Sequence, residues 1–132
     1  MSNEAQSVIE AAYAAFGRGD LPAIRGMLSD DRLDWTFHGA AGMPYTGSWH
    51  SADEVIRWFE SIPRVEEIEA FEPREIIAAG EHVTVLGWER TRSRATGRIF
   101  ESDWVHVFTV RGGRIVRFWG LYDTQAAAGA HG

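Results

Sequence analysis

The spacing of apolar residues predicts helices in three segments of the chain. In each segment apolar side chains recur every three to four residues, as they do along one face of an α-helix. The predicted helices cover residues 3–16, 20–28 and 51–62. Asp20 and Ser51 stand where helix caps are expected, and Glu54 follows Ser51 at the spacing of a capping box.

Most of the remaining chain alternates apolar and polar residues with the period of two that is typical of strands. The predicted strands cover residues 33–38, 66–77, 82–92, 99–110 and 114–122. Residues 39–47 read as a loop, and Pro73 indicates that its strand lies at a sheet edge. Helices followed by an antiparallel meander predict an α+β domain, in which the helices pack on one face of a curved sheet.

Composition limits the class of protein. The length of 132 residues predicts one domain over 1–132, and the small, polar residues 124–132 are expected to form a frayed tail. The formal net charge is −6 and no basic stripe occurs, so we expect no nucleic-acid partner. The chain has no cysteine and no apolar stretch long enough for a signal peptide or a membrane span, which favours a cytoplasmic protein without a membrane partner.

A hairpin signal at Gly112-Gly113 assigns the last two strands to faces. If these glycines form a two-residue loop, alternate residues of the two strands share a face. That face carries Trp104, His106, Trp119 and Asp123, with His106 opposite Trp119. If Thr96-Gly97 forms a similar loop, Glu89 extends the face onto a third strand. A β-bulge would change this parity.

The opposite face of these strands is also apolar. It carries Leu86, Trp88, Val105, Val107, Val116, Phe118 and Tyr122. Only one face can cover the helices, so the second needs another cover, and a partner subunit provides one. We assign the face with titratable groups to a cavity, and we expect the other face to form a homodimer.

Three titratable residues on the predicted cavity face are candidates for chemistry. His106 suits general acid–base catalysis because its ordinary pKa is near neutral, although it can also be a core histidine satisfied by a carbonyl group or a tyrosine. Asp123 can act as a base at the cavity mouth, cap the tail or pair with an arginine. Glu89 can act as an acid or base among aromatic groups, or point outward as a solvated carboxylate.

The aromatic residues are unusually numerous for a small core and predict the wall of an apolar binding site. The chain has six Trp, whose indole N–H groups can orient a ligand. The candidate ligand contacts are Tyr13, Trp35, Tyr45, Trp58, Glu89, Trp104 and Trp119. No metal-binding or nucleotide-binding motif occurs, so we expect neither a metal site nor a cofactor.

Four short motifs, taken in order, resemble the NTF2-like superfamily, and within it the SnoaL-like and ketosteroid-isomerase-like branch. The motifs are A-F-G-R-G-D-L-P-A-I at 15–24, L-S-D-D-R-L-D-W at 28–35, Y-T-G at 45–47 and G-G-R-I-V-R-F at 112–118, followed by Y-D-T. The resemblance implies a cone-shaped α+β barrel, in which three N-terminal helices and a strongly curved, mostly antiparallel sheet enclose an apolar pocket. It also implies that homodimers are common.

The catalytic residues of ketosteroid isomerases carry over poorly to this chain. By alignment, Thr36 occupies the position of their Asp base, and Ala12, next to Tyr13, occupies that of their oxyanion-hole tyrosine. His106 aligns with their protonated Asp. The Asp–Arg–Asp set of the limonene-epoxide-hydrolase-like members has no clear counterpart either.

These observations predict a protein that binds an apolar small molecule in an aromatic cavity. The leading hypothesis is a cofactor-independent enzyme of the isomerase, cyclase or hydrolase type, which acts on an apolar carbonyl compound by acid–base chemistry. The alternatives are a non-catalytic ligand-binding or dimeric accessory module, and a structural dimer whose cone is filled by side chains.

Overall fold

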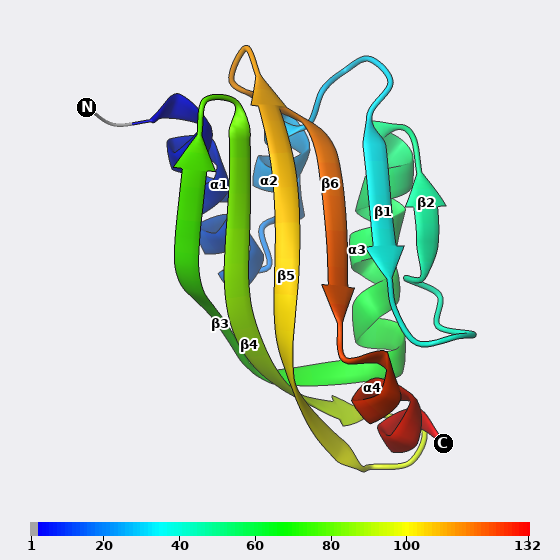
Figure 1. Ribbon diagram of the computed structural model, residues 1–132. Helices are drawn as coiled ribbons and strands as arrows, with labels where there is room; N and C mark the ends of the chain where they lie inside the picture. Colours follow the sequence, from blue (N-terminus) through cyan, green and yellow to red (C-terminus); the bar gives the residue numbers. More distant parts are fainter. Residues whose placement is uncertain (1–2) are drawn as a thin grey trace.

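The computed structural model describes residues 3–132 and confirms the α+β class (Figure 1). The helices are α1 (Glu4–Gly17), α2 (Leu21–Met27), α3 (Ala52–Val65) and α4 (Thr124–His131). The strands are β1 (Asp34–His38), β2 (Gly47–Trp49), β3 (Glu66–Ala79), β4 (His82–Ser93), β5 (Ile99–Arg111) and β6 (Arg114–Tyr122). The predicted caps are present, since Asp20 accepts the N–H of Ala23 and Ser51 accepts that of Glu54.

Within the described residues the strands form one curved, unclosed sheet in the order β2-β1-β6-β5-β4-β3. β1 runs parallel to β6, and the other neighbouring pairs are antiparallel. The helices α1, α2 and α3 lie behind one face of this sheet, and the lower halves of β3, β4 and β5 bend strongly beneath them (Figure 1). This curvature encloses the space between sheet and helices, where the buried aromatic core lies.

A β-bulge makes one sequence prediction wrong. Arg111 pairs with Arg114 as expected, but the register then shifts by one residue near Val116, so that His106 faces Gly120 and not Trp119. Since side chains alternate along a strand, the shift exchanges the two faces of β6 from this point. Phe118 and Tyr122 point into the core, and Trp119 lies on the outer face.

The connection between β4 and β5 is longer than the predicted two-residue loop at Thr96-Gly97. The last pair of the ladder joins Arg92 to Ile99, and Glu89 pairs with Ser102 instead of Trp104. The register is displaced by two residues, an even number, so the predicted face is unchanged. Glu89 therefore points into the core side of the sheet and is buried.

Residues 124–131 form helix α4, and the prediction of a frayed tail there is wrong. Asp123 caps this helix by accepting the N–H of Ala126 at 3.0 Å. The helix is fixed to the β4–β5 connection, because the Arg98 guanidinium donates to the carbonyl of Gly129 at 2.8 Å. Small alanines, read as unstructured from composition, are instead the residues that allow α4 to pack closely, and Ala127 is fully buried.

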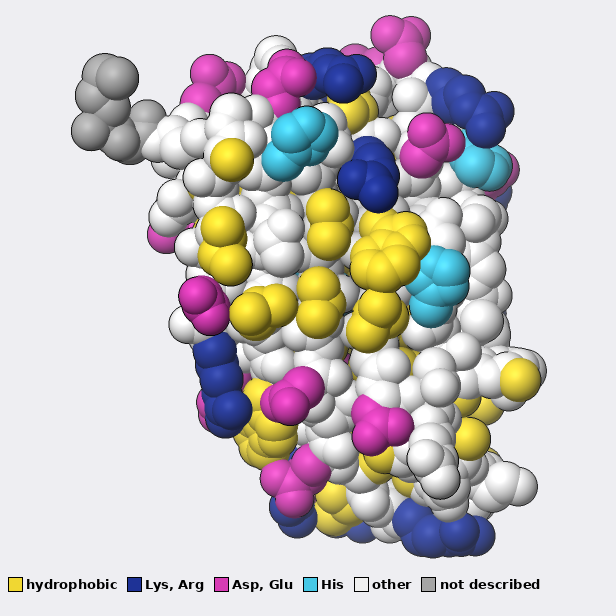
Figure 2. All heavy atoms as spheres, in the orientation of Figure 1, with side chains coloured by type: hydrophobic (Ala, Val, Ile, Leu, Met, Phe, Trp, Pro, Cys, Tyr) yellow, Lys and Arg dark blue, Asp and Glu magenta, His cyan; other side chains and the backbone are white. Residues whose placement is uncertain are grey.

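The outer face of the sheet carries a group of half-buried apolar side chains, which we call the outer apolar strip. It consists of Leu86, Val105, Val107, Val116, Trp119 and Leu121. Figure 2 shows hydrophobic side chains gathered over the middle of the sheet, with acidic and basic side chains around them.

Candidate functional site

A cavity lies between the helices and the inner face of the sheet. Its wall is mainly aromatic, and its contributors include Phe16, Trp35, Phe37, Trp58, Phe71 and Phe118. The volume of the cavity that is open to the centres of water molecules is about 90 Å³. On the same measure a single water needs ~10–15 Å³, so the cavity has room for more than one water. Among the described residues that line it there is no lysine or arginine. This lining suits an apolar ligand that carries a few polar groups.

His106 on β5 and Tyr13 on α1 form a hydrogen-bonded pair at one part of this wall. The Nδ1 atom of His106 lies 2.7 Å from the Tyr13 hydroxyl oxygen. Burial lowers the pKa of His106 to about 3 and raises the pKa of Tyr13 well above its usual value. Both side chains are therefore neutral at pH 7. The Tyr13 hydroxyl has no other hydrogen-bond partner among residues 3–132, so we assign it as the donor to Nδ1, which places the ring hydrogen on Nε2. This environment favours His106 as a neutral N–H donor to a ligand.

Trp104 fixes the position of the His106 ring. The centroids of the Trp104 and His106 rings are 4.1 Å apart and the rings are stacked. Phe71 also stacks on Trp104, with a centroid distance of 4.7 Å. Gly87, the register partner of Trp104, permits this stack, because a Cβ atom there would overlap the indole ring. Trp104 therefore lies behind the cavity wall and supports His106.

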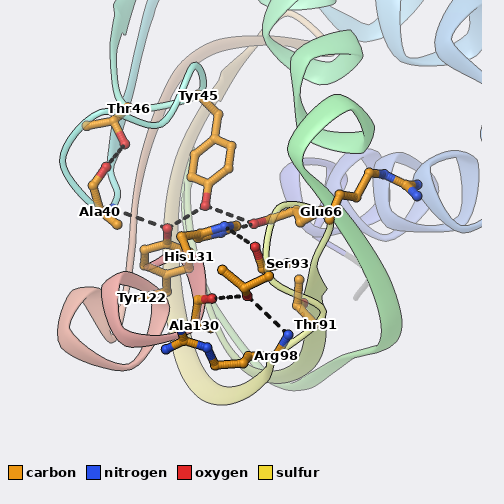
Figure 3. Close-up of polar contacts among 12 residues, drawn as sticks. Ala40, Tyr45, Thr46, Glu66, Thr91, Ser93, Arg98, Tyr122, Ala130 and His131 are labelled. Carbon is orange, nitrogen blue, oxygen red and sulfur yellow. Dashed lines mark hydrogen bonds and ion pairs between the residues drawn. The ribbon is translucent and has the colours of Figure 1, made fainter.

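A second polar group in the wall, which we call the carboxyl end, consists of Tyr45, Glu66, Glu89 and Tyr122. The Tyr45 hydroxyl donates to Glu66 Oε2 at 3.0 Å and lies 2.5 Å from the Tyr122 hydroxyl (Figure 3). The Tyr122 oxygen also accepts the N–H of Ala40 at 3.2 Å. Burial raises the pKa of Glu66 to about 7, although the Tyr45 hydrogen bond acts in the opposite direction. Glu66 therefore exchanges its proton near neutral pH.

Glu89 on β4 is the less supported of the two carboxyl groups. Its Oε1 accepts a hydrogen bond from the Thr91 hydroxyl at 2.8 Å, and no other partner of this carboxyl occurs among residues 3–132. Burial, followed by the neighbouring charge of Glu66, raises the pKa of Glu89 to about 7. The side chain is only 6% exposed and lines the cavity, which leaves Oε2 available to a ligand.

The two polar parts of the wall are separated along the sheet. His106 pairs with Val85, and Glu89 lies four residues further along the same strand. At ~3.4 Å per residue the two backbone positions are roughly 14 Å apart. A ligand that touches both therefore spans the aromatic middle of the cavity.

The structure brings together most of the candidate site residues. Those that line the cavity are Tyr13, Trp35, Tyr45, Trp58, Glu89 and His106. Trp104 supports the wall from behind, Trp119 lies on the outer face, and Asp123 is the cap of α4. The prediction that Trp119 faces the cavity is thus wrong because of the bulge, and for Asp123 the capping alternative is confirmed.

Two residues of the carboxyl end were not predicted. The sequence predicts Tyr122 on the outer face, because the bulge in β6 was not anticipated. The same bulge makes the prediction for Trp119 wrong. Glu66 begins the charged segment E-E-I-E, in which no pattern distinguishes it from its solvated neighbours Glu67 and Glu69. Its burial depends on the end of α3 and on α4, which close over it (Figure 3).

Within residues 3–132 no three His, Asp or Glu side chains are arranged to hold a metal ion. No helix in this part of the chain is long and apolar enough to cross a membrane.

Comparison with known proteins places the fold in a family. Residues 9–118 match the family model of the SnoaL-like domain. An NTF2-like protein from Burkholderia xenovorans LB400 is 31% identical, with 100% of this chain and 99% of that chain covered and a TM-score of 0.88. An NTF2-like protein of unknown function from Burkholderia pseudomallei K96243 is 33% identical, with 98% of each chain covered and a TM-score of 0.83.

A more distant structure carries the name of an activity. It is a putative polyketide cyclase from Xanthomonas campestris pv. campestris, 18% identical, with 98% of this chain and 97% of that chain covered and a TM-score of 0.78. No protein with a curated description matches the chain.

Proposed function

The chain belongs to the SnoaL-like family of NTF2-like proteins, and on this premise we propose that it binds an apolar carbonyl compound and converts it by acid–base chemistry of its own side chains. One observation carries the proposal: an aromatic cavity contains two buried carboxyl groups, Glu66 and Glu89, whose pKa values of about 7 suit proton transfer at neutral pH. Reactions of this type include isomerisation and cyclisation.

His106 supplies the group that polarises the substrate. A neutral imidazole whose Nδ1 accepts from Tyr13 presents Nε2–H as a donor, and in an apolar cavity such a donor stabilises negative charge that develops on a carbonyl oxygen. The aromatic wall holds the rest of the substrate and excludes water from the developing charge. Binding energy and polarisation thus come from different parts of the lining.

The carboxyl end supplies the proton transfer. A carboxyl group with a pKa near the working pH is present in both protonation states and can donate or accept a proton. The name of the Xanthomonas structure, a putative polyketide cyclase, agrees with cyclisation as one reaction of this class.

The experiment is a panel of apolar carbonyl compounds titrated against the protein while Trp fluorescence is recorded, followed by product analysis of those that bind. His106→Ala should lower kcat by ~10²–10³, the effect of removing one such donor. His38→Ala, on the exposed outer face of β1, is the matched control and should leave kcat unchanged. Binding without any turnover would refute catalysis and favour a ligand-binding module. Full activity of His106→Ala would refute the role of His106.

We further propose that a second copy of the chain covers the outer apolar strip. The strip has acidic residues Glu101 and Asp103 on one side of Val107 and the exposed Arg117 on the other. A two-fold axis near the centre of the strip turns one copy end to end, which brings Asp103 of one copy toward Arg117 of the other. A surface with this distribution of charge is self-complementary, as an isologous contact requires.

A further inference from the structure

The two carboxyl groups in the cavity differ in their hydrogen-bond donors. Glu66 Oε2 accepts from the Tyr45 hydroxyl and lies 3.0 Å from His131 Nε2, so that an ionised Glu66 can accept from two groups at one oxygen. Glu89 accepts a single hydrogen bond, from Thr91. Hydrogen bonds to a carboxylate favour its ionised form. Of the two groups, Glu66 is therefore the one whose negative charge the protein stabilises.

His131, the last residue of α4, is arranged as a donor to Glu66. Its Nδ1 lies 2.9 Å from the Ser93 hydroxyl, and burial lowers the pKa of His131, which keeps the ring neutral. A neutral ring has one N–H, and a carboxylate can only accept when it is ionised. In the state with Glu66 ionised, Nε2–H therefore donates to Glu66 and the Ser93 hydroxyl donates to Nδ1. Ser93 is fully buried and does not line the cavity, so this chain of contacts orients Glu66 and offers no nucleophile.

From this asymmetry we infer that Glu89 is the catalytic proton donor of the cavity, that Glu66 is its ionised partner, and that His131 is a positioning residue supplied by α4. The inference rests on the proposed function, and it names which carboxyl group performs the proton transfer. When the pair holds one proton, that proton is on Glu89 Oε2, because Oε1 already accepts from Thr91.

Other groups around the pair do not reverse this assignment. Tyr45 comes from the loop before β2, Tyr122 from β6 and His131 from α4, and all three are neutral at pH 7. His106 and Tyr13, on β5 and α1, complete the polar lining and are also neutral. No lysine or arginine is present among the described lining residues. The charge that acts most directly on Glu89 is therefore that of Glu66, which raises the pKa of Glu89.

The step balances without a co-reactant when the reaction is an isomerisation. The Glu66 carboxylate removes a proton from a carbon activated by the carbonyl group, and the electron pair of that C–H bond forms an enolate whose oxygen accepts from His106 Nε2–H. The O–H bond of Glu89 then breaks, and the electron pair of the enolate system forms a new C–H bond with that proton at another carbon, which restores the carbonyl group and leaves the double bond in its new position. Transfer of the proton from Glu66 to Glu89 returns the pair to its starting form.

Infrared spectroscopy tests the location of the proton without any substrate. Wild-type protein at pH 7 should show the C=O stretch of a protonated carboxyl group, because exposed carboxylates are ionised at that pH. Each single replacement leaves one of the two carboxyl groups, so the pH at which its band is lost can be compared. The band that remains in Glu89→Gln, from Glu66, should be lost at lower pH than the band that remains in Glu66→Gln, from Glu89, because Glu66 has the additional donor to its ionised form. The reverse order of the two titrations would overturn the assignment.

His131 is tested by comparing two replacements in the full chain. His131→Ala removes a donor from Glu66, which then holds its proton more firmly and exerts less charge on Glu89, so the titration of the Glu89 band should move to lower pH. His131→Gln retains a side-chain N–H and should restore the wild-type titration. Equal behaviour of the two variants would refute positioning through that hydrogen bond. Near-UV circular dichroism confirms that each variant is folded.

The two proposals fail in different ways. If the protonated group is Glu89 but no carbonyl compound is converted, then the proposed function fails while the proton assignment stands. If turnover occurs and Glu89→Gln retains it while Glu66→Gln loses it by ~10²-fold or more, then the proposed function stands and the choice of Glu89 is wrong.

Discussion

Replacing Glu89 by Gln should change how the stability of the protein depends on pH. In the folded protein, burial raises the pKa of Glu89 from the ordinary value of 4.5 to about 7. Between these two values the folded state holds a proton that the unfolded state has released. Unfolding then releases a proton, so the free energy of unfolding falls as pH rises through this interval.

The magnitude follows from the two pKa values. A tenfold change in an ionisation constant corresponds to ~1.4 kcal/mol, so the rise from 4.5 to about 7 makes the folded protein about 3 kcal/mol less stable at pH 8 than at pH 4.5. Glu66 contributes a loss of the same sign, because burial raises its pKa to about 7 as well. His106 contributes the opposite sign below pH 6.5, since its folded pKa of about 3 makes stability rise with pH there.

The assay is urea unfolding at a fixed protein concentration between pH 4.5 and pH 8. Glu89→Gln removes one of the two carboxyl contributions and leaves that of His106, so its free energy of unfolding should decline less than that of the wild type, by about 3 kcal/mol over this range. The control Glu60→Gln makes the same chemical change on the exposed side of α3 and should follow the wild type. Parallel curves for Glu89→Gln and the wild type would refute the reasoning that Glu89 is buried and protonated.

Two further predictions concern packing. Gly87→Ala should lower the free energy of unfolding by ~1–3 kcal/mol in thermal or urea unfolding, because its methyl group would overlap the Trp104 ring, whereas Gly26→Ala, with no neighbouring atom in the way, should not. Val107→Glu should convert the proposed dimer to a monomer in analytical ultracentrifugation, because the replacement places a charge in the middle of the outer apolar strip. The control Ile77→Glu, on the edge strand β3, should leave the dimer intact. A stable Gly87→Ala protein or a dimeric Val107→Glu protein would contradict the corresponding packing argument.

The fold was predictable from local signals that the structure reproduces. Asp20 and Ser51 begin helices as their capping patterns indicated, and the glycines at 112 and 113 form the turn between β5 and β6 with positive φ at both positions. The parity of β6 was not predictable. A bulge at Val116 depends on how the whole sheet bends, and it exchanged Trp119 for Phe118 at the cavity wall.

The carboxyl end was unpredictable for a different reason, which also explains its chemistry. Glu66 and His131 are 65 positions apart, and Tyr45 and Tyr122 are 77 positions apart, so no local pattern connects them. Glu66 and His131 meet because α4 folds against the bent ends of β4 and β5, where composition alone indicated a tail (Figures 1 and 3).

Two ionised carboxylates buried without a cationic partner would destabilise the folded protein at neutral pH. The cost is lower when one of the two carboxyl groups takes up a proton and becomes neutral. Glu89 has only the Thr91 donor, whereas Glu66 contacts Tyr45 and His131. In our proposal this difference divides the pair into one carboxylate and one acid, and the acid gives an apolar cavity a proton to transfer.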